Sequence, residues 1–180
     1  MEQRLQEQLE FEVDKLTESI ENAFTGEVFR TEIIRITGKQ SRQIKKADWL
    51  LDWHLELKGE EREVYKLTTV ENPSIAHGLI SISDIHDHVF MNLIESAKCN
   101  QGEKKMYRGV AGNLVAFACR TAFEKGYDGV VAFVAKTQLV EHYRLTLGAK
   151  AFAGNKMFID TRESLSLVKQ YFKDFNHGRK

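Results

Sequence analysis

The spacing of hydrophobic residues divides the chain into a first half of strands and a second half in which helices and strands alternate. Residues 49–57 alternate apolar and polar side chains and are predicted as a half-buried strand. Before them, residues 37–48 leave room for a loop or one short helix. Further strands of an antiparallel meander, rich in β-branched and aromatic residues, are predicted at 28–36, 64–70, 75–85 and 88–96.

The second half contains longer amphipathic stretches. Residues 110–125 repeat apolar side chains at helical spacing, and the continuously apolar residues 129–135 are predicted as a strand buried on both faces. A helix is predicted over residues 137–147, with Thr137 as its N-cap and Gly148 at its C-terminal end. This order predicts an α+β fold with a mostly antiparallel, mixed sheet flanked by helices. The chain is predicted to close with a hairpin over 150–160, turning at Gly154-Asn155, and a helix that begins at Asp160 with Glu163 in the capping-box position.

The first residues of the chain show a different pattern. Residues 1–24 are rich in Glu and Gln, and their apolar side chains recur four, four, three and four residues apart, which is typical of one stripe on a helix. We therefore expect an extra N-terminal amphipathic helix in residues 1–27, followed by the main domain in residues 28–180. Such a stripe packs either on its own domain or on a second subunit, as a homodimer contact. The stripe consists of Leu5, Leu9, Val13, Leu16 and Ile20.

Composition and charge narrow the classes of function. Hydrophobic residues make up 42% of the 180 residues and charged residues 29%, as in an ordinary soluble globular domain. The 26 Lys and Arg residues balance the 26 Asp and Glu residues, so bulk charge gives no indication of binding to nucleic acid or to a membrane. No signal peptide and no apolar run of membrane-spanning length are visible, which favours a cytoplasmic protein with its two cysteines reduced.

The stretch KKMYRGVAGN, residues 104–113, forms a basic, glycine-bearing turn between a predicted strand and a predicted helix. Amides at the start of a helix have no partner within it, and the helix dipole is positive there. Gly109 and Gly112 let the backbone come close to a ligand, while Lys104, Lys105 and Arg108 add positive charge. The turn is therefore predicted to bind an anion such as a phosphate. It lacks the Gly-Lys-Ser/Thr ending of a P-loop, and the meander before it is unlike a Rossmann unit.

The order of elements around this turn resembles the GNAT superfamily of acetyl-CoA-dependent N-acyltransferases. The resemblance covers residues 64–159 and centres on MYRGVAGNLVAFA. The family signature is Gln/Arg-x-x-Gly-x-Gly/Ala, with a leucine three residues further on. Gly109, Ala111 and Leu114 fill these positions, and Met106 stands where the family has Gln or Arg. The resemblance implies a GNAT-like acyl-CoA N-acyltransferase fold.

The resemblance also implies a co-substrate site. In that family the turn cradles the pyrophosphate of coenzyme A, and a strand edge pairs with the pantetheine arm. Acetyl-CoA is accordingly the implied co-substrate, and no metal is expected. The histidines of DIHDHVF, residues 84–90, are better explained by a solvated hairpin turn than by a metal site. The strand-edge residues are Leu93, Ile94 and Glu95, and those of the turn are Lys104, Lys105, Arg108, Gly109, Val110, Ala111, Gly112 and Asn113.

Two side chains are implied as catalytic. GNAT enzymes often carry a tyrosine ahead of a Gly-Phe pair as general acid toward the departing thiolate, and LVEHYRLTLGAKAF offers Tyr143. A neutral phenol with a pKa of about 10 suits that proton transfer. Tyr143 lies one residue further from Gly148 than the family spacing, at which Arg144 stands, and its alternative role is packing. Glu95 is the candidate general base toward the attacking amine, directly or through water, and its alternative role is that of an edge glutamate.

Two functions remain open. The first is transfer of an acetyl group from acetyl-CoA directly to a primary amine of a small molecule or a protein. The second is a catalytically inactive GNAT-like module for coenzyme A binding or protein interaction, which the departures at Met106 and Tyr143 favour. The intact Gly109-Val110-Ala111 turn and its lysines favour the enzyme.

Overall fold

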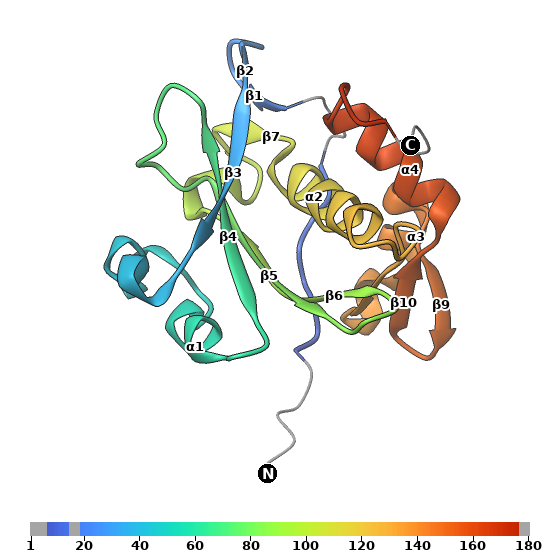
Figure 1. Ribbon diagram of the computed structural model, residues 1–180. Coiled ribbons are helices and arrows are strands. Elements are labelled where there is room, and N and C mark those ends of the chain that lie inside the picture. Colours follow the sequence, from blue (N-terminus) through green and yellow to red (C-terminus); the bar gives the residue numbers. More distant parts are fainter. Residues whose placement is uncertain (1–6, 15–18, 177–180) are drawn as a thin grey trace.

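A seven-stranded mixed sheet organises the chain (Figure 1). The computed structural model describes residues 7–14 and 19–176. Strands β3 to β6 form the expected antiparallel meander, β6 and β8 run parallel, and β8, β10 and β9 are again antiparallel, so the α+β prediction is confirmed. In spatial order the strands are β3 (Thr31–Ile36), β4 (Glu63–Thr69), β5 (Gly78–Asp84), β6 (Val89–Ser96), β8 (Val131–Val134), β10 (Lys156–Ile159) and β9 (Lys150–Ala153).

Helices and a small second sheet complete the described part of the chain. The second sheet has the order β2-β1-β7 and lies at the top of Figure 1. Its strands are β2 (Val28–Phe29), β1 (Ile20–Asn22) and β7 (Tyr107–Arg108). The α-helices are α1 (Trp53–Lys58), α2 (Val110–Glu124), α3 (Val140–Leu147) and α4 (Thr161–Tyr171). The 3-10 turns are η1 (Gly38–Gln43), η2 (Lys46–Asp48), η3 (Lys98–Asn100) and η4 (Thr137–Leu139).

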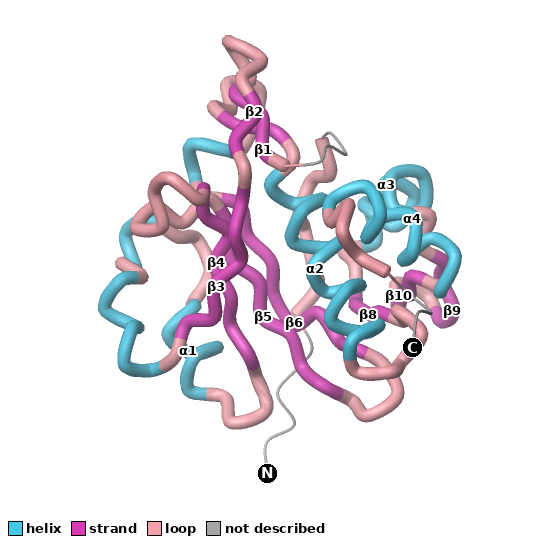
Figure 2. The backbone as a smooth tube through the Cα atoms, turned by 45° about the horizontal axis from the view of Figure 1, so that its top comes forward, coloured by secondary structure: helices cyan, strands magenta, loops and turns pink. Residues whose placement is uncertain are grey.

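The large sheet separates two hydrophobic cores. Helix α2 packs on β5, β6 and α4 on one face, whereas α1 and η1 lie across the sheet from it (Figure 2). Because successive residues of a strand point to opposite faces, Leu79 and Leu93 join the smaller core with Trp53, while Ile80 and Ile94 join the larger one. The sheet is therefore covered on both faces.

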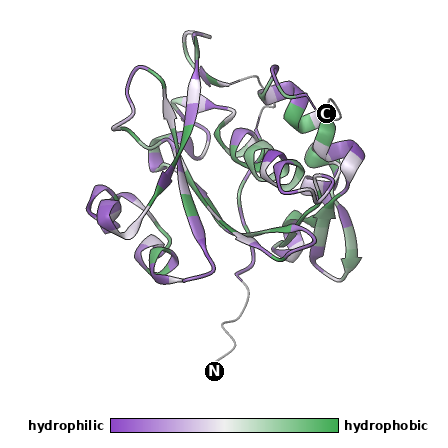
Figure 3. Ribbon diagram, in the orientation of Figure 1, coloured by the Kyte–Doolittle hydropathy of each residue, from purple (hydrophilic) through white to green (hydrophobic). Residues whose placement is uncertain are grey.

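Helix α2 is the centre of the larger core. Twelve of its fifteen residues are buried, and it carries hydrophobic residues over most of its length (Figure 3). Its burial fixes the position of its N-terminus, which is where the predicted phosphate turn lies. Across residues 7–14 and 19–176, no helix has the length and apolar character of a membrane span.

The predicted N-terminal helix is wrong over the residues that the structure describes. Residues 7–14 form an extended segment, and Ile20–Asn22 form strand β1. Leu9, Phe11 and Val13 are buried at alternate positions in the chain's own larger core, which is the period of a strand. Leu9, Val13 and Ile20 of the expected stripe are thus not available to a second subunit. Leu5 and Leu16 lie outside the described residues.

The strand predicted at residues 49–57 is also wrong. Its second half is the helix α1, which begins where the Asp52 carboxylate accepts a hydrogen bond of 3.1 Å from the Leu55 amide. Trp49 and Trp53 lie one helical turn apart in sequence. Their rings pack edge-to-face in the smaller core, with the ring centroids 6.4 Å apart. Of the alternating apolar side chains, Trp49 and Trp53 are spaced for the buried face of a helix, whereas Leu51 and Leu55 are exposed.

The boundaries in the second half agree closely with the sequence prediction. Gly148 ends α3 with a positive φ of 67°, and Gly154-Asn155 forms the turn of the β9–β10 hairpin. Asp160 caps α4 by accepting a hydrogen bond from the Thr161 amide. Thr137 is not the N-cap of α3, because it begins the separate 3-10 turn η4 and α3 starts after Leu139.

Candidate functional site

The sheet opens between β6 and β8. These parallel neighbours pair only at Val89 with Val131 and at Phe90 with Ala132, near the start of both strands. Beyond that point β6 continues to Ser96 alongside β5. The two strands diverge and leave a splay in the sheet that faces the N-terminus of α2.

A cavity of about 340 Å³ lies at this splay. One wall comes from the end of β6 and from Leu50 and Leu51, and the floor comes from the first residues of α2. The opposite wall comes from residues 7–14, which we call the N-terminal segment. The lining residues are Glu7, Gln8, Leu9, Glu10, Phe11, Glu12, Asp14, Leu50, Leu51, Leu93, Ile94, Glu95, Ser96, Asn100, Gln101, Gly102, Lys105, Val110 and Ala111.

The predicted phosphate turn holds a carboxylate. Gly109 is the N-cap of α2 with φ of 89°, a left-handed conformation that favours glycine. Its amide donates to Asp14 Oδ1 at 3.1 Å, and Lys105 Nζ lies 3.0 Å from Asp14 Oδ2. A backbone amide at a helix N-terminus together with an ammonium group is also the donor set that a phosphate needs, so these residues fit the pyrophosphate of coenzyme A.

The N-terminal segment pairs with the free edge of β8. The Leu9 amide donates to the Val134 carbonyl at 2.7 Å, and the Lys136 amide donates to the Leu9 carbonyl at 2.9 Å. Four residues further on, the Val13 amide donates to His142 Nε2 at 3.0 Å. The segment therefore runs through the splay from β8 to the phosphate turn.

The hydroxyl of Tyr143 faces the same segment. It donates to the Phe11 carbonyl at 2.6 Å, and the two aromatic rings stack with their centroids 4.5 Å apart. Tyr143 is fully buried, and this burial raises the pKa of its hydroxyl above the ordinary value of 10.0. The phenol is thus neutral at physiological pH, which is the form that can donate a proton.

Glu95 holds the loop before α1 in place. Its Oε1 accepts from the Leu50 amide at 2.7 Å, and its Oε2 accepts from Trp53 Nε1 at 2.7 Å and the Leu51 amide at 3.3 Å. A carboxylate offers about four acceptor positions. These three bonds therefore leave about one position through which Glu95 can accept a proton from the cavity.

The residues named from the sequence separate into two groups. Leu93, Ile94, Glu95, Lys105, Val110 and Ala111 line the cavity, and the Gly109 amide points to its edge. Lys104 and Arg108 are exposed outside the lining, and Gly112 is buried within α2. Asn113 is buried and its Nδ2 donates to Thr31 Oγ1 at 3.1 Å, which ties α2 to β3.

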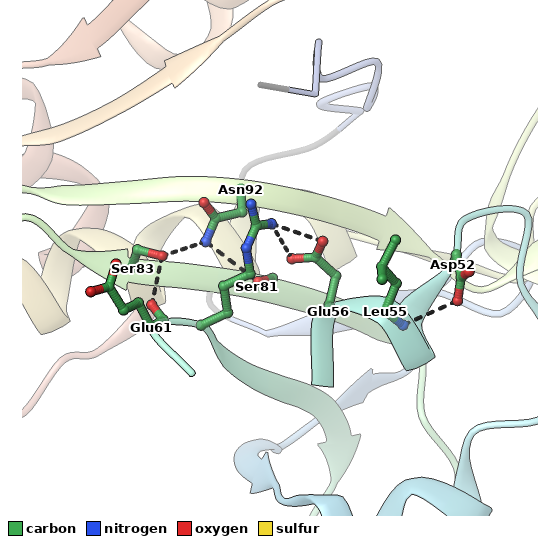
Figure 4. A network of polar contacts seen from close by, with 8 residues as sticks. Asp52, Leu55, Glu56, Glu61, Ser81, Ser83 and Asn92 are labelled. Atoms are coloured by element: carbon green, nitrogen blue, oxygen red, sulfur yellow. Dashed lines mark hydrogen bonds and ion pairs between the residues drawn. The ribbon is translucent and has the colours of Figure 1, made fainter. Parts of the chain in front are cut away.

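Strand β6 is irregular next to the cavity. Ser81 pairs with Leu93 and Ile82 with Met91, so the register leaves Asn92 as an extra residue. Asn92 Nδ2 donates to Ser83 Oγ at 2.8 Å, and Ser83 Oγ donates in turn to the Glu61 carbonyl (Figure 4). This bulge shifts by one residue the side chains that β6 directs at the cavity.

Two walls of the cavity come from stretches for which the sequence predicts another structure. The pattern predicts a strand at Leu50 and Leu51 and a helix over the N-terminal segment. The alternation LEFEVD at residues 9–14 was the available signal for an extended segment. Within the described residues, no group of three or more His, Cys, Asp or Glu side chains is arranged to hold a metal ion.

Comparison with known proteins identifies the fold. No protein-family model and no curated protein matches the sequence. Among solved structures, a KacTA–DNA complex is similar with a TM-score of 0.57 at 18% identity, over 78% of this chain and 99% of that chain. AtaTR bound with acetyl-CoA is similar with a TM-score of 0.50 at 17% identity, over 77% of this chain and 98% of that chain.

The first of these structures also bears on the expected partners. Bulk charge gives no indication of a nucleic-acid partner, and the similarity to a complex with DNA lends no support to the expectation that there is none. The mixed sheet with its splay, the glycine turn at the start of α2 and these two similarities agree with one another. The chain has the fold of the GNAT acetyltransferases.

Proposed function

We propose that the protein is an N-acetyltransferase that moves an acetyl group from acetyl-CoA directly to a primary amine. The observation that carries the proposal is the phosphate turn at the open end of the splay, where Gly109 and Lys105 already bind an anionic group. In this proposal the same two donors bind the pyrophosphate of coenzyme A. The edge of β6 at Leu93, Ile94 and Glu95 takes the pantetheine arm.

In this proposal Glu95 and Tyr143 move the two protons of this reaction; Glu95 lines the cavity, and the Tyr143 hydroxyl faces the N-terminal segment that forms its wall. Acetyl-CoA, when bound, supplies the activated acetyl group. As the nitrogen–carbon bond forms, Glu95 takes up the proton of the amine, directly or through water. As the carbon–sulfur bond breaks, the neutral phenol of Tyr143 gives its proton to the sulfur. The side chains of Glu95 and Tyr143 come from β6 and α3, on either side of the splay.

The rim of the cavity suggests the kind of acceptor. Leu50 and Leu51 are 72% and 38% exposed, and both donate their amides to Glu95. An apolar rim around a carboxylate fits a primary amine carried on an aliphatic stem, because the stem covers the leucines while the amine reaches Glu95. Long aliphatic amines and lysine-containing peptides are therefore the first acceptors to test.

The experiment that tests the proposal measures both coenzyme A binding and acetyl transfer. Release of free thiol from acetyl-CoA is followed with a panel of amines, and binding of coenzyme A is followed by calorimetry. We expect Gly109→Glu to abolish binding, because its side chain brings like charge and strain to the turn. Gly26→Glu is the matched control, since Gly26 also has a positive φ of 74° but lies in open space.

Tyr143→Phe tests the general acid. We expect the turnover number at saturating acetyl-CoA to fall about a hundredfold, because a transition-state proton donor is lost. An unchanged turnover number would remove Tyr143 from this role. Unchanged coenzyme A affinity in a folded Gly109→Glu variant would overturn the proposed binding site.

A second candidate function is a coenzyme-A-binding module without catalysis. It is favoured by the engagement of the Tyr143 hydroxyl with the Phe11 carbonyl, and by Met106 at the signature position. Tight binding of coenzyme A with no thiol release across the amine panel would support this function in place of the enzyme.

A further inference from the structure

The N-terminal segment lies where the proposed function needs coenzyme A. Its backbone pairs with β8 at the splay through the Leu9 amide and carbonyl. Figure 1 shows residues 7–14 in blue, passing behind α2 between β6 and the β8–β10 side of the sheet. The segment pairs with β8, and the pantetheine arm is expected on the facing edge of β6, so the two would occupy the same splay.

Side-chain burial holds the segment firmly in this position. Leu9, Phe11 and Val13 are 2%, 6% and 5% exposed, so they belong to the larger core. Phe11 stacks on Tyr143 and also lies against Phe133, with the ring centroids 6.3 Å apart. Glu10 and Glu12, the residues between them, are exposed. The segment is thus packed on one side and open to solvent on the other, as an edge strand would be.

The end of the segment places the Asp14 carboxylate at the phosphate turn. The Asp14 side chain is 15% exposed, and its two oxygens contact the Gly109 amide and Lys105 Nζ. Lys105 is itself only 13% exposed in its side chain. The segment therefore reproduces both features of the expected ligand, an extended arm in the splay and a negative group at the helix N-terminus.

We propose that residues 9–14 are an internal competitor of coenzyme A, with the Asp14 carboxylate in the place of the pyrophosphate. The inference rests on the proposed function, because it concerns the regulation of that same site. When the segment leaves, it frees the Gly109 amide, the Lys105 ammonium and the Tyr143 hydroxyl together. Binding and catalytic groups are thus released by one movement, and the apparent affinity for coenzyme A is lowered by the fraction of molecules that hold the segment in place.

The first test removes the charge of the competitor. Asp14→Asn keeps the size of the side chain but loses the attraction to Lys105, so we expect coenzyme A to bind about tenfold more tightly by calorimetry. Glu12→Gln is the matched control, because it removes the same charge within the segment, where no contact with Gly109 or Lys105 is seen. We expect its effect to be about threefold or less. Equal effects of the two variants, or weaker binding by Asp14→Asn, would overturn the inference.

The second test locks the segment in place. Leu9 is paired with Ala135 in parallel register, and the next residues, Glu10 and Lys136, form an ion pair at the surface. Cysteines at positions 10 and 136 are therefore neighbours across the pairing and suited to a disulfide. Glu10→Cys with Lys136→Cys is made in a Cys99→Ser background, because Cys99 is an exposed free thiol. A free-thiol count and a circular dichroism spectrum verify the lock and the fold.

The oxidised, locked protein should lose coenzyme A binding, and reduction should restore it. Equal binding by the oxidised and reduced forms would overturn the inference while leaving the proposed function standing, since the segment would then be a fixed wall of the site. Absence of binding in both the reduced double variant and the wild-type protein would overturn the proposed function, and the inference with it.

Discussion

At the scale of single residues, polar side chains that the sequence marks as candidate catalytic or binding groups also connect separate parts of the fold. Glu95 fixes Leu50, Leu51 and the Trp53 indole, and Asn113 ties α2 to β3. The sequence identifies which side chains are able to transfer protons or bind anions. It does not show which backbone and side-chain groups compete for them, because those partners lie about 40 to 80 residues away.

His77 supports the loop that leads to the phosphate turn. Its carbonyl accepts hydrogen bonds from the Ala97 amide at 2.9 Å and from Asn100 Nδ2 at 3.2 Å. Its ring packs edge-to-face on the Tyr107 ring, with the centroids 4.8 Å apart. Burial lowers the pKa of His77 below its ordinary value of 6.5, because the charged form loses its hydration.

This burial predicts a pH-dependent stability. Below about pH 6.5 the unfolded chain binds a proton at His77 that the folded protein resists, so the free energy of unfolding falls as the pH drops through this range. Urea unfolding at about pH 7.5 and about pH 5.5 measures the loss. His77→Gln should reduce it, whereas His86→Asn should not, because the His86 side chain is 92% exposed. An equal loss in wild type and His77→Gln would contradict the prediction.

At the scale of elements, the errors of prediction share one cause. In residues 9–14 a helical and a strand period both fit the apolar positions, and the same is true of residues 49–57. The strand period holds in the first case and the helical period in the second. Other elements can be predicted from the sequence, because turn residues, caps and the burial pattern agree there. They are strands β4 to β6, helices α2 and α4 and the β9–β10 hairpin. The two ambiguous stretches are decided by tertiary contacts, and both form walls of the cavity.

The N-cap of α1 tests whether residues 49–57 are helical for the reason given. A helix of six residues has few internal hydrogen bonds, so its start depends on the bond from the Leu55 amide to the Asp52 carboxylate (Figure 4). We expect Asp52→Ala to lower the free energy of unfolding by about 1 kcal/mol, measured by urea denaturation, and Asp52→Asn to have almost no effect. Equal losses in the two variants would show that the cap is not the source of the effect.

At the scale of the whole molecule, one sheet serves both cores. Strands β4, β5 and β6 contribute side chains to each core, so neither core can be lost without breaking the sheet that supports the other. Trp49 and Trp53, the two tryptophans of the chain, both lie in the smaller core. Helices α2 and α4 lie on the side of the larger core. The two cores therefore have separate spectroscopic probes.

We expect the two probes to report a single transition. Tryptophan fluorescence follows the smaller core and far-ultraviolet circular dichroism follows mainly the helices, and their urea unfolding curves should coincide. A tryptophan transition at clearly lower urea than the helical one would mean that the smaller core opens on its own.

The path of the N-terminal segment also constrains the order in which the protein folds during synthesis. The bond from the Tyr143 hydroxyl to the Phe11 carbonyl spans 132 residues, and the bond from the Gly109 amide to Asp14 spans 95. By contrast, β3 to β6 follow one another along the chain and pair as neighbours. On the ribosome residues 9–14 must wait until β8 and α3 have emerged, while the meander can already close. The nascent domain therefore passes through a stage in which the splay is formed on its β6 side and does not yet hold residues 9–14.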